Sequence, residues 1–289
     1  MSTTIQNSQY GKGIMTYDIV DALFVPLTQT RAKLGESPVW SDAHDAIWWV
    51  DIQGHKVLRT TLAGETQAWT TPEMPGFVQC IGRDVFIGMQ SGIFVFDDQA
   101  ATFHKVAPLY LENQRFNDAC TDAQGRIWAG TMDIDNQHAN GVLYLFDPAA
   151  LTLTSKAEGS RTINGLAWDN RNQRLFFSDS HPSIQTVWTV KINQHDTMSP
   201  RTVFARFDDL SGRPDGAAID AKGRYWIAGV GGGAIYCFEP DGTLGTKYNV
   251  PFQSPTKPAF VPPDNHAMVL TSFTDNGDDG KLGIYRGDL

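Results

Sequence analysis

Cysteine is scarce in this chain, and no two cysteines have the spacing of a redox or zinc motif. The 289 residues contain only Cys80, Cys120 and Cys237, which lie far apart. A disulfide framework needs a denser set, so we expect free thiols and a reducing compartment. The seven histidines form no HExxH or similar cluster, which argues against a zinc site made by neighbouring residues.

Long hydrophobic runs and an excess of basic residues are also missing. No stretch of about 18 apolar residues occurs, which excludes a membrane span, and the polar segment 1–13 does not resemble a signal peptide. Lys and Arg number 23 against 32 Asp and Glu, giving a net charge of -9. An acidic surface repels phosphate backbones, so nucleic acid is a poor candidate partner. We expect a cytoplasmic protein with a small-molecule partner.

Two common catalytic motifs are absent as well. The segment 88–92 (GMQSG) misplaces the serine of a Gly-x-Ser-x-Gly nucleophile elbow, and no phosphate-binding Gly-x-x-x-x-Gly-Lys-Ser/Thr segment occurs. Glycine and proline are plentiful instead, with 27 and 15 copies that fall mostly between short apolar runs. That distribution favours an all-β chain with many turns.

A repeated unit gives the architecture. An apolar approach, an Asp/Gly-rich turn and a hydrophobic strand recur most clearly at 119–130 and 218–229. Weaker copies lie at 38–49, 165–177, 80–87 and 259–269. The six copies follow one another at intervals of 38 to 49 residues. Such a period is typical of propeller blades, so we predict an all-β, six-bladed β-propeller that forms a single domain over residues 1–289.

The two ends of the chain predict how the ring closes. The chain ends soon after Tyr285, before the last blade is complete, whereas about 30 residues precede the first repeat. We expect the apolar segment 22–26 to supply the missing strand of the last blade. Residues 1–15 are then a flexible or peripheral N-terminal segment.

Four polar segments occupy the same position in their repeats, just before the Asp/Gly-rich turn. They are 35–40 with Glu36, 115–118 (RFND), 162–168 with Asn164, and 213–219 with Arg213 and Asp215. In a propeller, these positions converge at one end of the central channel. Asn-Gly and Asp-Gly are common turn formers, so each segment alone could be a turn. Four such segments in phase indicate a site.

The ordered set of motifs resembles a known family. The segments 36–40 (ESPVW), 115–118 (RFND), 130–132 (GTM), 164–168 (NGLAW) and 214–216 (PDG) are similar to the signature segments of the regucalcin/gluconolactonase (senescence marker protein) family. They follow that family's order, and the resemblance covers about residues 30 to 285. Singly these motifs are weak, but the ordered set is specific.

The resemblance implies a site and a reaction. It implies a divalent cation bound by Glu36, Asn164 and Asp215, substrate contacts from Arg115 and Asn117, and an acid/base role for Asp215. A further acidic substrate contact falls at Asp135, one methylene shorter than the family's usual Glu, with Asp133 as a rival. The implied activity is hydrolysis of an aldonolactone to its sugar acid, in which the cation polarises the lactone carbonyl. Either Asp215 or a cation-bound water then activates the nucleophile.

The implied ligand set is chemically consistent. Two carboxylates and an amide oxygen form an all-oxygen shell that suits Ca²⁺ best, with Mg²⁺, Mn²⁺ or Zn²⁺ as alternatives. A propeller that hydrolyses phosphoesters or other esters remains a second hypothesis. A non-enzymatic Ca²⁺-binding or protein-interaction propeller is a third, and it leaves the aligned carboxylates unexplained. Selectivity is expected from the loops 53–56, 133–140 and 181–185, and Arg115 with Arg213 leaves open a lactone that carries an anionic group.

Overall fold

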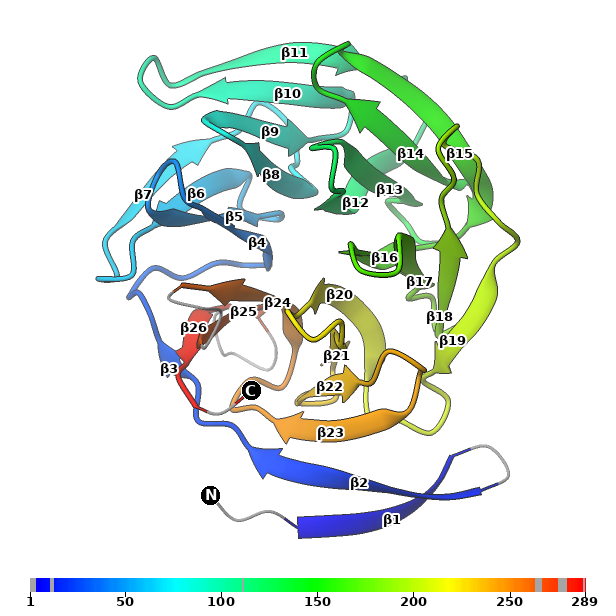
Figure 1. Cartoon of the computed structure of the whole chain (residues 1–289). Coiled ribbons are helices and arrows are strands. Elements are labelled where there is room, and N and C mark those ends of the chain that lie inside the picture. The colour runs from blue at the N-terminus through cyan, green and yellow to red at the C-terminus, as the bar shows by residue number, and fades with distance from the viewer. Residues whose placement is uncertain (1–3, 11–12, 111, 263–266, 275–279, 288) are drawn as a thin grey trace.

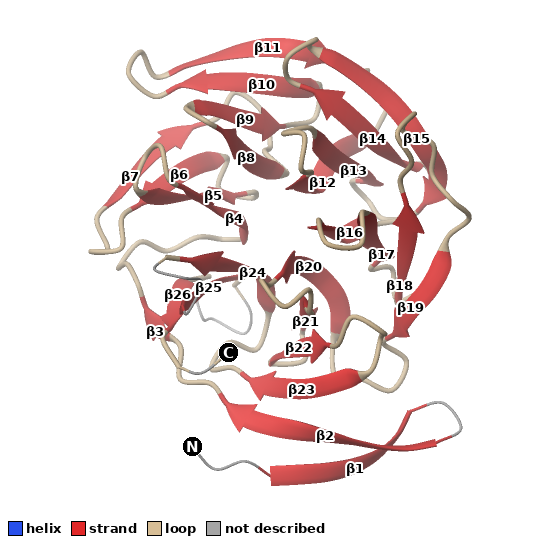
Figure 2. Cartoon of the chain, viewed as in Figure 1, coloured by secondary structure: helices blue, strands red, loops and turns tan. Residues whose placement is uncertain are grey.

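The chain folds into six sheets arranged around a common axis, as Figures 1 and 2 show. This computed structural model describes residues 4–10, 13–110, 112–262, 267–274, 280–287 and 289. Those residues contain strands and no α-helix, and hence no helix that could span a membrane. The prediction of an all-β, six-bladed β-propeller is confirmed.

Each blade is an antiparallel four-stranded sheet whose first strand lies nearest the axis (Figure 1). Blade 1 comprises β4 (Gly35–Ser41), β5 (Ala46–Asp51), β6 (Lys56–Thr60) and β7 (Thr66–Thr70). Blade 2 comprises β8 (Phe77–Ile81), β9 (Asp84–Gly88), β10 (Gly92–Asp97) and β11 (Thr102–Pro108). Blade 3 comprises β12 (Gln114–Thr121), β13 (Ile127–Asp133), β14 (Gly141–Asp147) and β15 (Thr152–Ser160). Blade 4 comprises β16 (Ile163–Asp169), β17 (Arg174–Asp179), β18 (Thr186–Lys191) and β19 (Thr202–Arg206). Blade 5 comprises β20 (Arg213–Ile219), β21 (Tyr225–Val230), β22 (Ala234–Phe238) and β23 (Leu244–Asn249). Blade 6 comprises β24 (Pro255–Val261), β25 (Ala267–Ser272), β26 (Leu282–Tyr285) and β3 (Val25–Pro26).

The ring closes where the two ends of the chain share blade 6. In that sheet β3 pairs antiparallel with β26, and Val25 lies opposite Ile284. The neighbouring Phe24 packs its ring on Phe252 and Tyr285, with centroids 6.1 and 5.4 Å apart. The predicted closure by an N-terminal strand is therefore confirmed.

Before β3, the N-terminal segment forms a hairpin on the outside of the ring. Strand β1 (Thr4–Tyr10) pairs antiparallel with β2 (Gly13–Asp21), and β2 pairs parallel with β23. The hairpin thus extends blade 5 to six strands at its outer edge (Figure 1). Nothing in the polar sequence 1–13 indicates β1.

The core lies between blades. Each of the six hydrophobic clusters joins side chains of two neighbouring blades. Adjacent residues of β5 illustrate the pattern, because Trp48 packs toward blade 2 and Trp49 toward blade 6. Side chains alternate across a strand, so one sheet contributes to two interfaces and depends on both neighbours.

The repeated turn has a specific stabilising interaction. In blade 3, Asp122 accepts hydrogen bonds from the backbone N–H of Gln124 and Arg126, from Arg126 Nε at 2.9 Å and from Trp128 Nε1 at 3.2 Å. The same interactions recur in blade 5 among Asp220, Arg224 and Trp226. The clearest sequence repeat therefore corresponds to a turn whose aspartate is hydrogen-bonded to residues of the turn and of the strand that follows.

Candidate active site

The polar side chains near the axis come from irregular positions in the innermost strands. A β-bulge interrupts the pairing of β4 between Glu36 and Val39, of β16 between Asn164 and Ala167, and of β20 between Pro214 and Ala217. A bulge adds an unpaired residue and redirects its side chain. The Asn-Gly and Asp-Gly pairs are thus bulges within strands, and interpreting them as turns is wrong.

One cavity of about 220 Å³ gathers most of the predicted site residues. Five of the six line it, and all five are buried: Glu36, Arg115, Asn117, Asn164 and Asp215. They come from blades 1, 3, 4 and 5, so the structure brings together residues up to 179 positions apart in the sequence. Pockets for drug-sized ligands usually measure about 300–1,000 Å³, so this cavity suits a smaller ligand such as one sugar ring.

The remaining predicted residue lies elsewhere. Asp135 is exposed, is not among the cavity residues, and accepts a hydrogen bond from Asn113 Nδ2 at 2.9 Å. Its rival Asp133 is buried, and its carboxylate accepts the backbone N–H groups of Gln137 and His138. In this structure Asp133 holds its loop, and neither carboxylate joins the other five residues.

Several cavity residues escaped the sequence analysis. Asn136 belongs to the loop 133–140, and its Oδ1 accepts a hydrogen bond from Thr162 Oγ1 at 2.6 Å. Thr256 comes from β24, whose bulge places it as the bulge of β20 places Asp215. The degenerate blade 6 repeat concealed this equivalence. Only its phase with the other five blades could have identified Thr256.

Aspartates at the ends of second strands fix the loops around the cavity. Asp51, Asp133 and Asp179 are each the last residue of such a strand, and all three are buried. Asp179 accepts backbone N–H groups from Arg161 and Thr162 at 2.8 and 3.1 Å. Hydrogen bonds from several N–H groups to one carboxylate stabilise the loop conformation. The cavity rim is therefore held by buried acids that do not line it.

Two carboxylates in the cavity have no positively charged neighbour in contact. Among the described residues, no Lys, Arg or His nitrogen lies within 4.0 Å of Glu36 or Asp215. Burial, followed by the charge of Asp215, raises the pKa of Glu36 well above its usual value. Burial also raises the pKa of Asp215 to about 7, although Arg213 acts in the opposite direction. Buried carboxylates without a cationic partner are unusual except where a cation binds.

Asn164 completes this group. Its Nδ2 donates to Asp215 Oδ1, while its Oδ1 accepts the N–H of Gly165 at 3.1 Å. No group of three His, Cys, Asp or Glu side chains that could hold a metal occurs in the described part of the chain. The amide of Asn164 is the candidate third ligand; its Nδ2 faces Asp215 in this structure, so binding through Oδ1 requires the amide to turn over. Two carboxylates and one amide oxygen fit a hard divalent cation.

Arg115 positions the neighbouring amide. Its Nη1 donates to the carbonyl of Phe116 at 2.9 Å and to Asn117 Oδ1 at 2.8 Å. Asn117 Nδ2 in turn donates to the carbonyl of Ile163 at 2.9 Å. Burial lowers the pKa of Arg115 to about 10, so the guanidinium stays charged at neutral pH. A fixed cation and a fixed amide therefore face the same small cavity.

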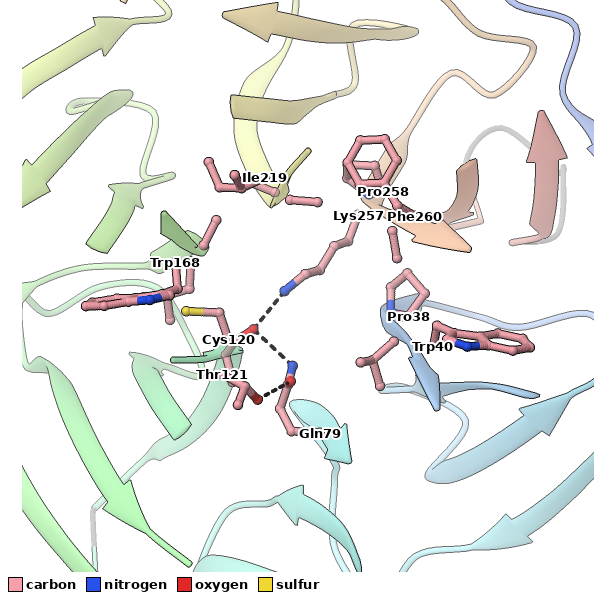
Figure 3. A pocket seen from close by; sticks show the side chains of 17 residues that line it. Pro38, Trp40, Gln79, Cys120, Thr121, Trp168, Ile219, Lys257, Pro258 and Phe260 are labelled. Carbon is pink, nitrogen blue, oxygen red and sulfur yellow. Dashed lines mark hydrogen bonds between the residues drawn. The ribbon is translucent and has the colours of Figure 1, made fainter. Parts of the chain in front are cut away.

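A second cavity of about 340 Å³ lies farther along the innermost strands and shares no residue with the first (Figure 3). Lys257 lines it and donates to Asp118 Oδ1 at 2.5 Å and to the carbonyl of Ala119 at 2.9 Å. From the opposite side, Gln79 Nε2 donates to the same carbonyl at 3.2 Å. The buried Lys257–Asp118 pair thus lies between the two cavities.

Fold and site together define a six-bladed propeller whose channel gathers buried carboxylates, amides and guanidinium groups at one end. The SMP-30/Gluconolactonase/LRE-like region family model matches residues 34–274. The chain therefore belongs to the SMP-30/gluconolactonase/LRE-like family.

Individual relatives cover most of the chain. It is 30% identical over 250 residues to the 6-deoxy-6-sulfogluconolactonase of Pseudomonas putida, covering 84% of each protein. It is 28% identical over 260 residues to the pentonolactonase of Haloferax volcanii, covering 87% of this chain and 86% of that one. The crystal structure of the calcium-binding protein regucalcin from Agrobacterium tumefaciens has the same fold, with a TM-score of 0.84, 23% identity, and 94% and 97% of the two chains covered.

Proposed function

We propose that this protein hydrolyses a sugar lactone to the corresponding sugar acid, using a divalent cation held by Glu36, Asn164 and Asp215. The observation that carries the proposal is a pair of buried carboxylates, without a cationic side chain in contact, in a cavity suited to one sugar ring. The relatives named as lactonases support the reaction class, the hydrolysis of a carboxylic ester bond.

The cation we expect first is Ca²⁺. The ligand set contains only oxygen atoms, which hard cations prefer, and it includes neither histidine nor cysteine. When bound, the cation supplies positive charge beside the lactone carbonyl oxygen, where negative charge develops during water attack. The name of the regucalcin neighbour, a calcium-binding protein, agrees with this choice.

Side chains of the cavity perform the remaining steps. Arg115 and Asn117 bind and orient the sugar hydroxyls, because their mutual hydrogen bond fixes both groups in place. Asp215 accepts a proton from the attacking water while the water oxygen bonds to the carbonyl carbon. The bond from that carbon to the ring oxygen then breaks, and Asp215 returns the proton to the leaving oxygen.

The proposal is tested with Glu36→Ala. Lactone hydrolysis is followed as proton release on a panel of neutral and anionic aldonolactones, with metal-stripped protein and with Ca²⁺ restored. Wild-type protein should turn over only with the cation, and the variant should lose at least 100-fold in kcat/KM together with tight Ca²⁺ binding, since one of two charged ligands is gone.

The matched control is Glu65→Ala, which removes an exposed carboxylate from the same blade. This variant should retain the wild-type rate and affinity. Failure of the wild-type protein to hydrolyse any lactone in the panel, with Ca²⁺ bound, would contradict the proposed reaction. Equal turnover in stripped and restored protein would contradict the role of the cation.

A further inference from the structure

The charged groups of the cavity are not balanced once the carboxylates bind a cation. Glu36 and Asp215 contribute two negative charges, and Arg115 and Arg213 contribute two positive ones. In the described part of the chain, no carboxylate lies within 4.0 Å of either guanidinium group. A divalent cation offsets the two carboxylates, so both arginines remain as excess positive charge at the place where substrate binds.

The two arginines differ in what they can contact. Arg115 is buried, and both of its described hydrogen bonds hold neighbouring groups of blade 3. Arg213 is half-buried, and its Nη1 donates one hydrogen bond to the carbonyl of Ser180 at 3.3 Å. A guanidinium group carries five N–H donors in a planar fork suited to oxyanions. Among the described residues, the other N–H donors of Arg213 at the cavity wall have no acceptor.

The position of Arg213 sets the part of a ligand it can reach. It precedes Asp215 by two residues on β20, and both side chains line the same cavity. A strand rises about 3.3 Å per residue, so the two Cα atoms are roughly 6–7 Å apart along it. Arg213 is therefore within reach of the far end of a lactone whose carbonyl lies at Asp215.

We infer that Arg213 binds an anionic substituent at the end of the substrate distant from the lactone carbonyl. The preferred substrates are then sugar lactones that carry a carboxylate, phosphate or sulfonate group on the terminal carbon. This inference rests on the proposed lactonase function and adds the substrate class and the residue that selects it. The net charge of -9 does not oppose it, since distant surface charges are screened beyond about 10 Å.

The test compares matched pairs of lactones that differ only in the group on the terminal carbon, which is neutral in one member and anionic in the other. D-glucono-1,5-lactone is paired with its 6-phosphate, and D-glucono-1,4-lactone with D-glucaro-1,4-lactone. The wild-type protein should favour the anionic member of each pair in kcat/KM. Arg213→Gln should lower this anionic-to-neutral ratio by about ten- to a hundredfold, the effect of losing one charge-assisted hydrogen-bonded contact.

Two variants separate recognition from other effects. Arg213→Lys keeps the charge but loses the planar fork, so it should give an intermediate anionic-to-neutral ratio. It can replace Arg213→Gln in the test if the glutamine variant does not fold. Arg161→Gln removes a half-buried guanidinium near the same rim that also bonds a backbone carbonyl but does not line the cavity. It should leave the ratio at the wild-type value.

A binding measurement distinguishes failure of this inference from failure of the lactonase proposal. Calorimetry compares 1,5-anhydroglucitol with its 6-phosphate, neither of which contains a lactone. Tighter binding of the phosphate that is lost in Arg213→Gln supports the inference even if no lactone is turned over. The inference would be overturned if the wild-type protein bound neutral and anionic ligands equally well, or if the preference for the anionic ligand persisted in Arg213→Gln. Neither result would contradict the proposed lactone hydrolysis.

Discussion

Because Glu36 and Asp215 are buried, cation binding is coupled to the release of protons. Desolvation penalises the charged form of a carboxylate, which is why the pKa of Asp215 rises to about 7 and that of Glu36 rises as well. A cation needs the deprotonated form, so binding must displace protons near neutral pH. In the metal-free protein the folded state holds these protons more tightly than the unfolded chain, so stability should fall as pH rises from about 4 to about 7.

The affinity of the stripped protein for Ca²⁺ should therefore increase between pH 6 and pH 8, by about tenfold for the titration of Asp215 alone. Calorimetry in buffers of different ionisation enthalpy measures both the affinity and the protons released. Asp215→Asn cannot release that proton, so its weaker affinity should depend less on pH. A wild-type affinity that stays constant or falls over this range would contradict the proposed ligands.

Single residues also show where sequence reasoning ends. Glu36, Arg115 and Asp215 could be chosen because each begins an innermost strand in phase with the repeat. Asp133 and Asp135 could not be told apart in this way, since an acid that holds a loop and an acid that contacts substrate look alike in sequence. Only the hydrogen bonds of Asp133 to the N–H groups of its own loop reveal its role.

At the scale of elements, the bulges of the innermost strands form the site. In β16 the bulge requires Gly165, whose φ of 60° is unfavourable for residues with a side chain. A Cβ there would lie 2.6 Å from Tyr225 Oη and 2.9 Å from Ser178 Oγ. The glycine that follows Asn164 is thus needed both for its conformation and for the space around it.

Gly165→Ala should lower the free energy of unfolding by about 2–4 kcal/mol, through strain at positive φ and contacts closer than van der Waals distance. It should also weaken Ca²⁺ binding, because Asn164 shifts. Gly82→Ala is the matched control, since Gly82 has a φ of 57° with no atom within 4 Å of the added Cβ. Denaturant unfolding and calorimetry measure both effects; equal losses in the two variants would exclude a role for crowding.

The elements themselves were largely predictable. Alternating apolar strands and Asp/Gly-rich turns identified hairpins because the turn aspartates bond to the strand that follows, as Asp122 does. The bulges were not predictable, since Asn-Gly and Asp-Gly also favour turns. Blade 6 was the faintest copy, which is why Thr256 was missed although its strand has the same irregularity.

At the scale of the whole molecule, stability depends on closing the ring. Every blade buries both faces against neighbours, so a gap at blade 6 would expose two interfaces. The intervals between repeats predicted the number of blades and the short chain end predicted the closure. The hairpin of β1 and β2 was not predicted, because β1 is polar and the hairpin adds to an outer edge beyond the repeated unit. We propose that residues 1–289 form one domain.

Two truncations test the closure. Removing residues 1–21 deletes β1 and β2 but keeps β3, whereas removing residues 1–27 also deletes β3 and Phe24 with its aromatic contacts. The longer deletion should lower the melting temperature by roughly 5 °C or more beyond the shorter one, as expected for the loss of a few kcal/mol. Calorimetric unfolding scans measure the difference; similar melting temperatures would show that β3 contributes little.

The Lys257–Asp118 pair has a consequence for molecular traffic. Because the pair lies between two cavities whose lining residues do not overlap, we propose that it closes the channel at this point. Under the proposed function, a sugar acid formed beside Asp215 would then leave through the opening that admitted its lactone, before the next lactone can enter. The product would also carry a new carboxylate close to two arginines, so product release would limit the rate of turnover.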